Sequence, residues 1–381
     1  MESASPILLA DIAAKPTMSA TPKTLYLSIL SRLNAHMNAP RKDLSGNKSA
    51  KNPKIHPVQH QRTTARAVSR QGEDGRSLSY HLYTIWLFTR SDLKTVVFPQ
   101  ILFALFNTLS GQVLSTSTTS GMSGILFRVV LGVVWIWVNL LFEVIANQRI
   151  STSITEDAIN KPWRPIPSKR LDSDQARQLL FVVVPCAFLV SWLLDVTTLS
   201  TSLMALTWLY NDLGGADEHY LVRNLLNAFG LLSFGTGATF ILGGQSDNRL
   251  TSRGQQWFFM IGAIITTTVH VQDLPDMQGD IARNRKTVPL VWGERTARFS
   301  AAGMILAWSL VCPIFWNARL PTCSLFGLLG LGLATWIVRS RGVTADKLAW
   351  KFWCLWMIVL FAVPLCADSA ASLLSNVGAM L

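Results

Sequence analysis

The chain has 381 residues, of which 50% are hydrophobic and only 15% are charged. Soluble proteins of this length carry about a quarter charged residues, so the composition excludes an ordinary soluble enzyme and indicates an integral membrane protein. The formal net charge of +12 at pH 7 lies in the N-terminal region and in short connectors, which favours lipid headgroups or anionic substrates over nucleic acid as binding partners.

The first 75 residues are rich in Ser, Ala, Lys, Arg and Gln and contain few aromatic side chains. Because so little apolar surface cannot offset the entropy lost on folding, we predict a disordered basic tail over residues 1–75 and a transmembrane domain over residues 76–381. The apolar patch PILLADIAA at residues 6–14 is short and has no basic flank, so we expect no cleaved targeting signal.

Apolar segments follow the tail, separated by short polar connectors. A membrane-spanning helix needs about 20 predominantly apolar residues, so we predict an all-α bundle of nine transmembrane helices. The third and fourth segments are separated only by DVTTLS, and the fourth is short. The predicted spans cover residues 95–115, 124–146, 177–195, 197–211, 222–243, 256–272, 299–317, 321–338 and 350–367.

Basic residues are distributed unequally between the two sides of these spans. With nine spans, the chain up to Lys94 and the connectors after spans two, four, six and eight share one side, and they hold 14 and 16 Lys and Arg residues respectively. The opposite side keeps Arg128, Arg249, Arg253 and Arg319. Because cytosolic loops carry an excess of Lys and Arg, we predict a cytosolic N-terminus and cytosolic even-numbered connectors, in the endoplasmic reticulum membrane.

Span six ends in DLPDMQGD, which places Asp273, Asp276 and Asp280 at the cytosolic edge of a hydrophobic segment. On a continuous helix, spacings of three and seven residues put the carboxylates along one stripe, although Pro275 and Gly279 can break the helix. Carboxylates on one stripe repel one another unless a cation lies between them. Hard oxygen donors suit Mg²⁺, which keeps several waters and bridges to substrate phosphates. We therefore predict a Mg²⁺ site; the alternative is a solvated loop that happens to be acidic.

A second polar stretch, FEVIANQRISTSITEDAINKPWRPIPSKR at residues 142–170, follows span two on the same predicted side of the membrane. It contains the carboxylates Glu156 and Asp157. Two sets of carboxylates that face each other, with Lys and Arg around them, can bind a diphosphate carried on Mg²⁺. The basic residues beside the two stretches are Lys161, Arg164, Arg283, Arg285 and Lys286.

These stretches resemble the motifs of the UbiA superfamily of intramembrane prenyltransferases over about residues 80–370. DLPDMQGD is similar to the DxxDxxxD motif after the sixth helix of that family, and NKPWRPIPS is similar to the turn after its first motif. The resemblance implies a nine-helix UbiA-type bundle with a polar active-site cavity on the cytosolic side. It also implies that Asp273, Asp276, Asp280 and Asp157 act in catalysis by binding the diphosphate through Mg²⁺.

The first motif departs from the family pattern NDxxDxxxD. Asn147 matches, but Gln148 stands where Asp is usual, so the resemblance implies Asp157, helped by Glu156 and Asn147, as the metal ligands of this motif. The stretch YNDLGGADEHYLVRN after span four is acidic where the family is often basic, which leaves Arg223 as its cation. The residues expected to bind the diphosphate are Lys161, Arg164, Tyr210, Arg223, Arg283 and Lys286.

Aromatic side chains near the two motifs are candidates to stabilise carbocations through their ring faces. They are Trp135, Trp137, Phe142, Trp208 and Tyr210. The alternative is that they pack between helices or lie at the membrane interface.

The two departures, together with HLYTIWLFTRSDLKTVVFPQ at residues 81–100, resemble a fungal branch of the superfamily whose members act as membrane-bound terpene cyclases. This implies a Mg²⁺-dependent lyase that ionises a prenyl diphosphate, such as farnesyl diphosphate, and cyclises it to a sesquiterpene hydrocarbon. The alternative is a prenyltransferase that moves the prenyl group to an aromatic or quinone-like acceptor. A transporter is disfavoured because the spans carry almost no ionisable residues. We expect the substrate and the lipid bilayer as partners, with no obligate protein partner.

Overall fold

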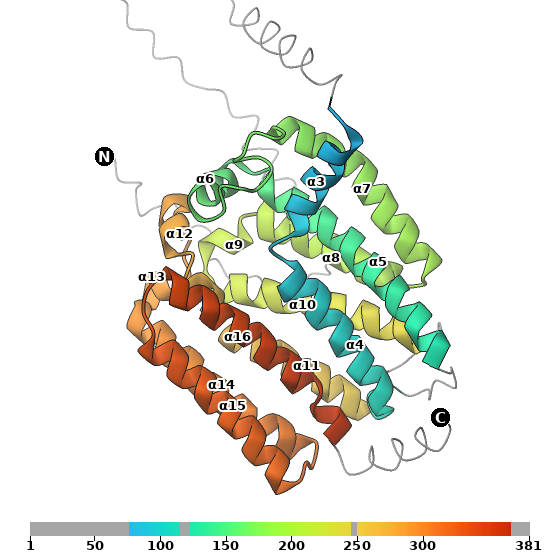
Figure 1. Ribbon diagram of the computed structural model, residues 1–381, viewed down its shortest axis with the longest axis vertical. Helices are drawn as coiled ribbons and strands as arrows, with labels where there is room; N and C mark the ends of the chain where they lie inside the picture. Colours follow the sequence, from blue (N-terminus) through green and yellow to red (C-terminus); the bar gives the residue numbers. More distant parts are fainter. Residues whose placement is uncertain (1–75, 115–121, 245–249, 367–381) are drawn as a thin grey trace, which may run out of the picture. The chain divides into compact units, whose positions relative to one another are not determined.

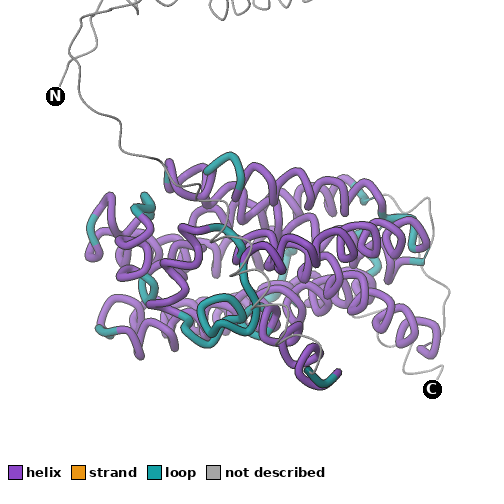
Figure 2. The backbone as a smooth tube through the Cα atoms, turned by 90° about the horizontal axis from the view of Figure 1, so that it is seen from above, coloured by secondary structure: helices purple, strands orange, loops and turns teal. Residues whose placement is uncertain are grey.

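The computed structural model describes residues 76–114, 122–244 and 250–366, and these residues form helices and no β-strand (Figures 1 and 2). One isolated antiparallel bridge joins Leu114 to Leu250. The all-α prediction is therefore confirmed. The predicted tail over residues 1–75 lies outside the described residues, as do the last residues of the first and ninth predicted spans.

The described part of the chain contains nine longer helices and eight shorter helical elements. The long helices are α4 (Phe98–Ser110), α5 (Met122–Gln148), α7 (Ser173–Leu193), α8 (Thr197–Asn211), α10 (Tyr220–Gly243), α11 (Ser252–Thr268), α14 (Glu294–Phe315), α15 (Leu320–Arg339) and α16 (Val343–Phe361). The shorter elements are α3 (Leu78–Thr89), η2 (Leu93–Val97), α6 (Ser151–Asn160), α9 (Gly215–Glu218), η3 (Val269–Asp273), α12 (Met277–Arg283), α13 (Val288–Trp292) and η4 (Val363–Cys366).

A long helix occupies each of the nine predicted ranges, but the number of nine spans is not confirmed. In the described part of the chain, six segments are long and apolar enough to cross a membrane: η2 with α4, and α5, α7, α10, α14 and α15. Helices α8 and α11 have 15 and 17 residues, fewer than a perpendicular span needs. Helix α16 carries three charged residues, Asp346, Lys347 and Lys351, in its first half.

Helix α10 lies in the middle of the bundle and packs against α4, α5, α8 and α11 (Figure 1). Two of its glycines make this close packing possible. A Cβ atom on Gly237 would overlap the indole ring of the fully buried Trp135 of α5, and one on Gly235 would lie 2.6 Å from Oε1 of Gln100 of α4. Small residues let helices approach closely in a membrane, where helices associate through van der Waals contact.

The DLPDMQGD stretch does not continue α11 as one helix. The chain forms a 3₁₀ turn over Val269–Asp273, Asp276 stands just before the next helix, and Asp280 lies inside α12. Pro275, which lies between the two helical segments, has no N–H to donate to a helical hydrogen bond. The expectation of three aspartates on one continuous helical stripe is therefore wrong, because α11 ends at Thr268 and α12 begins only at Met277.

Candidate active site

The two acidic stretches lie at one end of the bundle, where α6 packs against α12 (Figure 1). Asn160, the last residue of α6, donates a hydrogen bond from Nδ2 to the backbone oxygen of Asp276 at 3.2 Å. Gly279 is required here because a Cβ atom would overlap the Asn160 side chain. Nζ of Lys161 lies 3.5 Å from Oδ2 of Asp276. The NKP turn is thus in direct contact with the second aspartate of DLPDMQGD.

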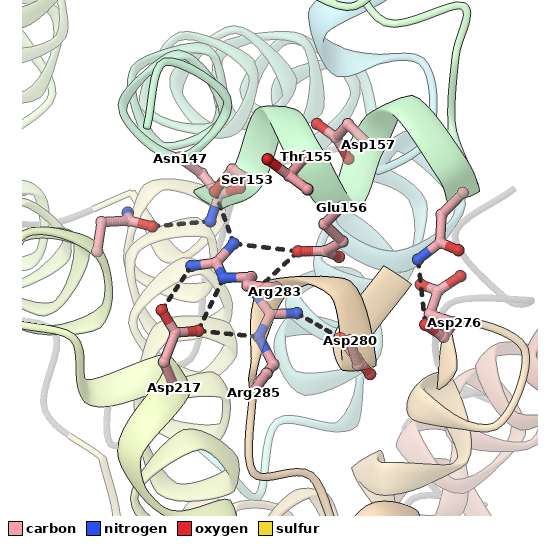
Figure 3. Close-up of polar contacts among 12 residues, drawn as sticks. Asn147, Ser153, Thr155, Glu156, Asp157, Asp217, Asp276, Asp280, Arg283 and Arg285 are labelled. Carbon is pink, nitrogen blue, oxygen red and sulfur yellow. Dashed lines mark hydrogen bonds and ion pairs between the residues drawn. The ribbon is translucent and has the colours of Figure 1, made fainter. Parts of the chain in front are cut away.

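Glu156 is the carboxylate of the first stretch that points toward the second stretch (Figure 3). Its Oε2 lies 3.0 Å from Nη1 of Arg283 and 3.1 Å from Nη2 of Arg285. Asp217 accepts from the same two guanidinium groups, at 2.8 Å from Arg283 Nε and 3.1 Å from Arg285 Nε. Arg285 also donates to Oδ1 of Asp280 at 2.9 Å. Two arginines therefore connect α6, α9 and α12.

Asp157 lies on the other side of α6 and points away from this network (Figure 3). It accepts two hydrogen bonds from Nη1 of Arg164, at 2.7 and 3.0 Å, and its side chain is almost fully buried. Nη2 of Arg164 also donates a hydrogen bond to the Ser91 hydroxyl, at 3.2 Å. This pair joins α6 and the NKP turn to the segment between α3 and η2.

Asp273 is paired with the cation predicted from the acidic stretch after span four. Nη2 of Arg223 lies 2.8 Å from Oδ1 of Asp273, and Nη1 of the same guanidinium donates to the Tyr210 hydroxyl. Arg223 belongs to α10 and Tyr210 to α8, so helices from the middle of the bundle hold the aspartate that ends η3. Asn211, next to Tyr210, accepts a hydrogen bond from Nδ2 of Asn147 at 2.7 Å.

A cavity of about 510 Å³ begins at these residues and extends between the helices. At its polar end it is lined by Asn147, Glu156, Lys161, Arg164, Tyr210, Arg223, Asp276 and Arg285. The cavity is also lined by aliphatic and aromatic side chains of α5, α8, α10 and α16, and by two lysines of α16, Lys347 and Lys351. The apolar side chains include Leu140, Leu203, Leu206, Leu231, Phe234, Trp350 and Trp353. The shape suits a ligand with a charged head and an apolar body.

The charges around the cavity shift two carboxyl groups in opposite directions. Burial alone would raise the pKa of Glu156, but the charges of Arg285, Lys161 and Arg283 outweigh it and lower that pKa to about 2. Burial raises the pKa of Asp280 to about 7, with a further contribution from the charge of Asp273, against the attraction of Arg223 and Arg285. The carboxylate of Glu156 is thus charged at neutral pH, whereas the pKa of Asp280 lies near neutral pH.

Two carboxylate oxygens of the second stretch have lone pairs that no described residue uses. Oδ2 of Asp273 and Oδ2 of Asp280 are buried and form no hydrogen bond with the described residues. Within the described part of the chain, no three His, Cys, Asp or Glu side chains are grouped closely enough to hold a metal ion alone. These oxygens fit Mg²⁺, a hard cation that binds through one or two carboxylates and completes its shell with water and substrate phosphate.

The predicted site residues fall into three groups. Asn147, Glu156, Lys161, Arg164, Tyr210, Arg223 and Asp276 line the cavity. Asp157, Asp273, Asp280 and Arg283 are buried behind its wall in ion pairs. Lys286 is exposed, and its backbone N–H donates to the backbone oxygen of Asp217 at 3.0 Å. The catalytic, metal-binding and diphosphate-binding roles assigned to these residues stay predictions.

Sequence reasoning missed several side chains of the site. Asp217 and Ser153 both bind Arg283, and the acidic character of the stretch after span four was the signal that could have found Asp217. Of the five aromatic candidates, Tyr210 lines the cavity. Trp135 is instead buried against Ser191, and Trp208 is 57% exposed. Aromatic side chains that do line the cavity are Trp163, Phe234, Trp350 and Trp353, and their places depend on tertiary packing.

The sequence profile of the UbiA prenyltransferase family matches residues 104–358 of this chain. The chain belongs to the UbiA prenyltransferase family. This confirms the resemblance seen in the two motifs. The family match, together with six helical segments in the described part of the chain that are suited to crossing a bilayer, identifies this UbiA-family protein as an integral membrane enzyme.

Relatives of known function fall on both sides of the cyclase and transferase alternatives. This UbiA-family protein is 29% identical over 300 residues to somaliensene A/B synthase of Streptomyces somaliensis, a match that covers 76% of the chain and 94% of the relative. It is 32% identical over 240 residues to fumagillin β-trans-bergamotene synthase of Aspergillus fumigatus, covering 62% and 75%. It is 30% identical over 171 residues to digeranylgeranylglyceryl phosphate synthase of Methanobrevibacter smithii, covering 42% and 57%.

A solved structure shows the same fold. The UbiA homologue of Archaeoglobus fulgidus, in complex with GPP and Mg²⁺, superposes with a TM-score of 0.51 at 10% sequence identity. The superposition covers 74% of this chain and 99% of the homologue. At this identity the likeness establishes a UbiA-like arrangement of helices.

Proposed function

We propose that this UbiA-family protein is a Mg²⁺-dependent terpene cyclase that converts farnesyl diphosphate to a sesquiterpene hydrocarbon, such as β-trans-bergamotene, and releases diphosphate. The observation that carries the proposal is the cavity, whose lining combines Lys161, Arg223 and Arg285 beside carboxylates with a large set of apolar side chains. The similarity to somaliensene A/B synthase and to fumagillin β-trans-bergamotene synthase supports the cyclase, and these matches cover 94% and 75% of the two relatives.

Mg²⁺ fits Asp273, Asp276, Asp280 and Glu156, and when bound it would neutralise the diphosphate and make it a better leaving group. The A. fulgidus homologue binds Mg²⁺ together with a prenyl diphosphate, which supports the same use here. Around the diphosphate, Lys161 supplies a point charge, and Arg223 and Arg285 supply planar N–H donors. These charges stabilise the negative charge that develops as the C–O bond breaks.

The apolar part of the cavity then determines the fate of the allylic cation. When the C–O bond breaks, its electron pair leaves with the diphosphate oxygen. Leu203, Leu206 and Leu231 line the cavity, and apolar walls of this kind would keep water from the cation, so that it reacts with a double bond of its own chain. The indole rings of Trp350 and Trp353 are stacked with centroids 4.7 Å apart and line the cavity. Their faces can stabilise positive charge along the chain.

The orientation in the membrane follows from the basic connectors. The end of the bundle that holds α6 and α12 is the end predicted to be cytosolic from the excess of Lys and Arg. Farnesyl diphosphate has a charged diphosphate group and an apolar prenyl chain. It can therefore enter the cavity from the cytosolic face, with its prenyl chain directed toward the bilayer. We place the enzyme in the endoplasmic reticulum membrane with its active site facing the cytosol.

The second candidate is a prenyltransferase that uses an aromatic or quinone-like acceptor. The similarity to digeranylgeranylglyceryl phosphate synthase favours it, as do the polar side chains Thr207, Asn227 and Gln272 in the cavity wall, which could hold an acceptor. The deciding experiment incubates membranes containing the protein with farnesyl diphosphate and Mg²⁺ in the absence of any acceptor. Release of diphosphate with a volatile hydrocarbon supports the cyclase. Farnesyl diphosphate that stays intact until a phenol is added overturns it in favour of the transferase.

A further inference from the structure

Glu143 is a carboxylate of the cavity wall that the diphosphate-binding network does not use. It belongs to α5, lines the cavity, and is partly buried. No hydrogen bond or ion pair of the described part of the chain involves Glu143, and the carboxylate of Asp92, which also lines the cavity, repels it. Ionisable side chains inside membrane helices are expensive and are usually functional, so a role in the cavity is the expectation for this one.

Glu143 lies on α5 between Asn147, which is near the predicted diphosphate-binding residues, and the apolar Leu140. Leu140, Glu143, Val144 and Asn147 all line the cavity, which is the i, i+3, i+4, i+7 pattern of one helical face. Glu143 precedes Asn147 by four residues and therefore lies about 6 Å deeper along α5, at a rise of about 1.5 Å per residue. A prenyl chain whose diphosphate lies at the Asn147 end passes this carboxylate.

Other polar side chains of the same helix have partners that explain them. Asn139 donates to the backbone oxygen of Trp135 at 3.0 Å and accepts from the Ser200 hydroxyl at 2.5 Å. Asn147 binds Asn211, and Gln148 donates to the backbone oxygen of Phe88 at 3.1 Å. These contacts fasten α5 to its neighbours. Glu143 contributes nothing of that kind, so its carboxylate is free to act on a ligand.

We propose that Glu143 is the base that ends the cyclisation. The proposal rests on the proposed terpene cyclase function. The carboxylate takes a proton from a carbon next to the cationic carbon of the cyclised chain. The electron pair of the broken C–H bond forms the C=C bond of the product, and the cation is neutralised. Glu143 is left protonated and returns the proton to water at the polar end of the cavity, so the balance is one prenyl diphosphate to one hydrocarbon, one diphosphate and one proton.

The test separates ionisation from termination. Glu143→Gln and Glu143→Asp are compared with the unchanged full-length protein, using farnesyl diphosphate and Mg²⁺, with diphosphate release and product composition measured in the same reaction. Asp174→Asn is the matched control, because its side chain is a carboxylate that is 72% exposed at the start of α7. We expect Glu143→Gln to release diphosphate within about tenfold of the unchanged rate.

In Glu143→Gln the share of the original hydrocarbon should fall at least tenfold, replaced by other olefins or by alcohols from capture of water. Glu143→Asp should recover part of the original product, since it keeps the carboxylate and retracts it by one methylene group. An unchanged product in Glu143→Gln overturns the proposal, and so does an equal loss of diphosphate release and product in a folded variant. If Glu143→Gln does not fold, Glu143→Asp is used in its place. A smaller share of the original hydrocarbon with diphosphate release retained then supports the proposal, and an unchanged product composition overturns it. Failure of the unchanged protein to form any hydrocarbon would instead overturn the cyclase function itself.

Discussion

Glu156 and Asp280 are bound by one guanidinium group: Arg285 Nη2 lies 3.1 Å from Glu156 Oε2, and Arg285 Nη1 lies 2.9 Å from Asp280 Oδ1. These carboxylates come from the two acidic stretches, which are more than one hundred residues apart in the sequence. All three side chains are buried or nearly so. One of the contacts between the stretches is thus a shared cation supplied by the protein, and this relationship can be tested directly.

Replacing Arg285 by Ala should destabilise the site as well as inactivate it. Removing one partner of a buried ion pair leaves uncompensated charge and costs about 3–5 kcal/mol. We expect a lower melting temperature in detergent and loss of diphosphate release. The matched control is Arg295→Ala, because Arg295 is exposed and lies over the Phe299 ring. An Arg285→Ala protein that melts like the control would contradict the bridging role.

Asp273→Ala and Asp276→Ala should each abolish turnover while expression and membrane insertion persist. Asp276 lines the cavity, and Asp273 has a buried oxygen without a hydrogen-bond partner among the described residues. Asp276 is therefore suited to bind a cation, and Asp273 can do so through Oδ2 while its Oδ1 stays paired with Arg223. The measurement is diphosphate release by membranes that contain equal amounts of each protein. Normal activity in either variant would remove Mg²⁺ binding from that residue.

Glu156→Gln should reduce turnover more than Asp157→Asn does. Glu156 lines the cavity and contacts Arg283 and Arg285, whereas Asp157 points to the other side of α6 and binds Arg164. We expect Asp157→Asn to lower the melting temperature and to keep more of the rate. The family pattern assigns the metal ligand to Asp157, so the opposite order of rates would support that pattern against the geometry.

Mg²⁺ affinity should weaken as the pH falls below about 7. Burial raises the pKa of Asp280 to about 7, so its proton must leave before the carboxylate can bind a cation. Below that pKa the apparent affinity should fall by up to about tenfold per pH unit. The measurement is the Mg²⁺ concentration for half-maximal diphosphate release at pH 6 and at pH 8, after removal of metal with a chelator. Asp280→Asn should make this Mg²⁺ concentration nearly independent of pH. Equal Mg²⁺ concentrations at pH 6 and pH 8 in the unchanged protein would refute the prediction.

Gly237→Ala should destabilise the contact between α10 and α5. The added methyl group would overlap the Trp135 ring, and overpacking of this kind costs about 1–3 kcal/mol. Gly303→Ala is the matched control, because Gly303 also lies in a long helix and has no atom within 4 Å of a built Cβ. We expect a lower melting temperature in the first variant alone. Equal melting temperatures would show that Trp135 moves aside without cost.

The membrane class, the positions of the long helices and both acidic stretches were predictable because each is encoded locally. A run of apolar residues can be recognised in the sequence without knowing what it packs against. The same holds for the spacing of aspartates and for an NKP turn. The number of spans was less predictable. Helices α8, α11 and α16 are apolar enough to be recognised but too short or too charged to qualify as spans on their own.

The sequence by itself determined that this is an all-helical membrane protein with two polar stretches of the UbiA type, since composition, periodicity and motif spacing act within a short length of chain. Tertiary structure alone decided that Glu156 rather than Asp157 faces the second motif, that Asp217 binds both arginines, and that Trp350 and Trp353 line the cavity. Neighbouring residues on a helix point about 100° apart, so their partners depend on how helices distant in sequence pack. That packing sums many weak contacts over the whole bundle, and no single segment records it.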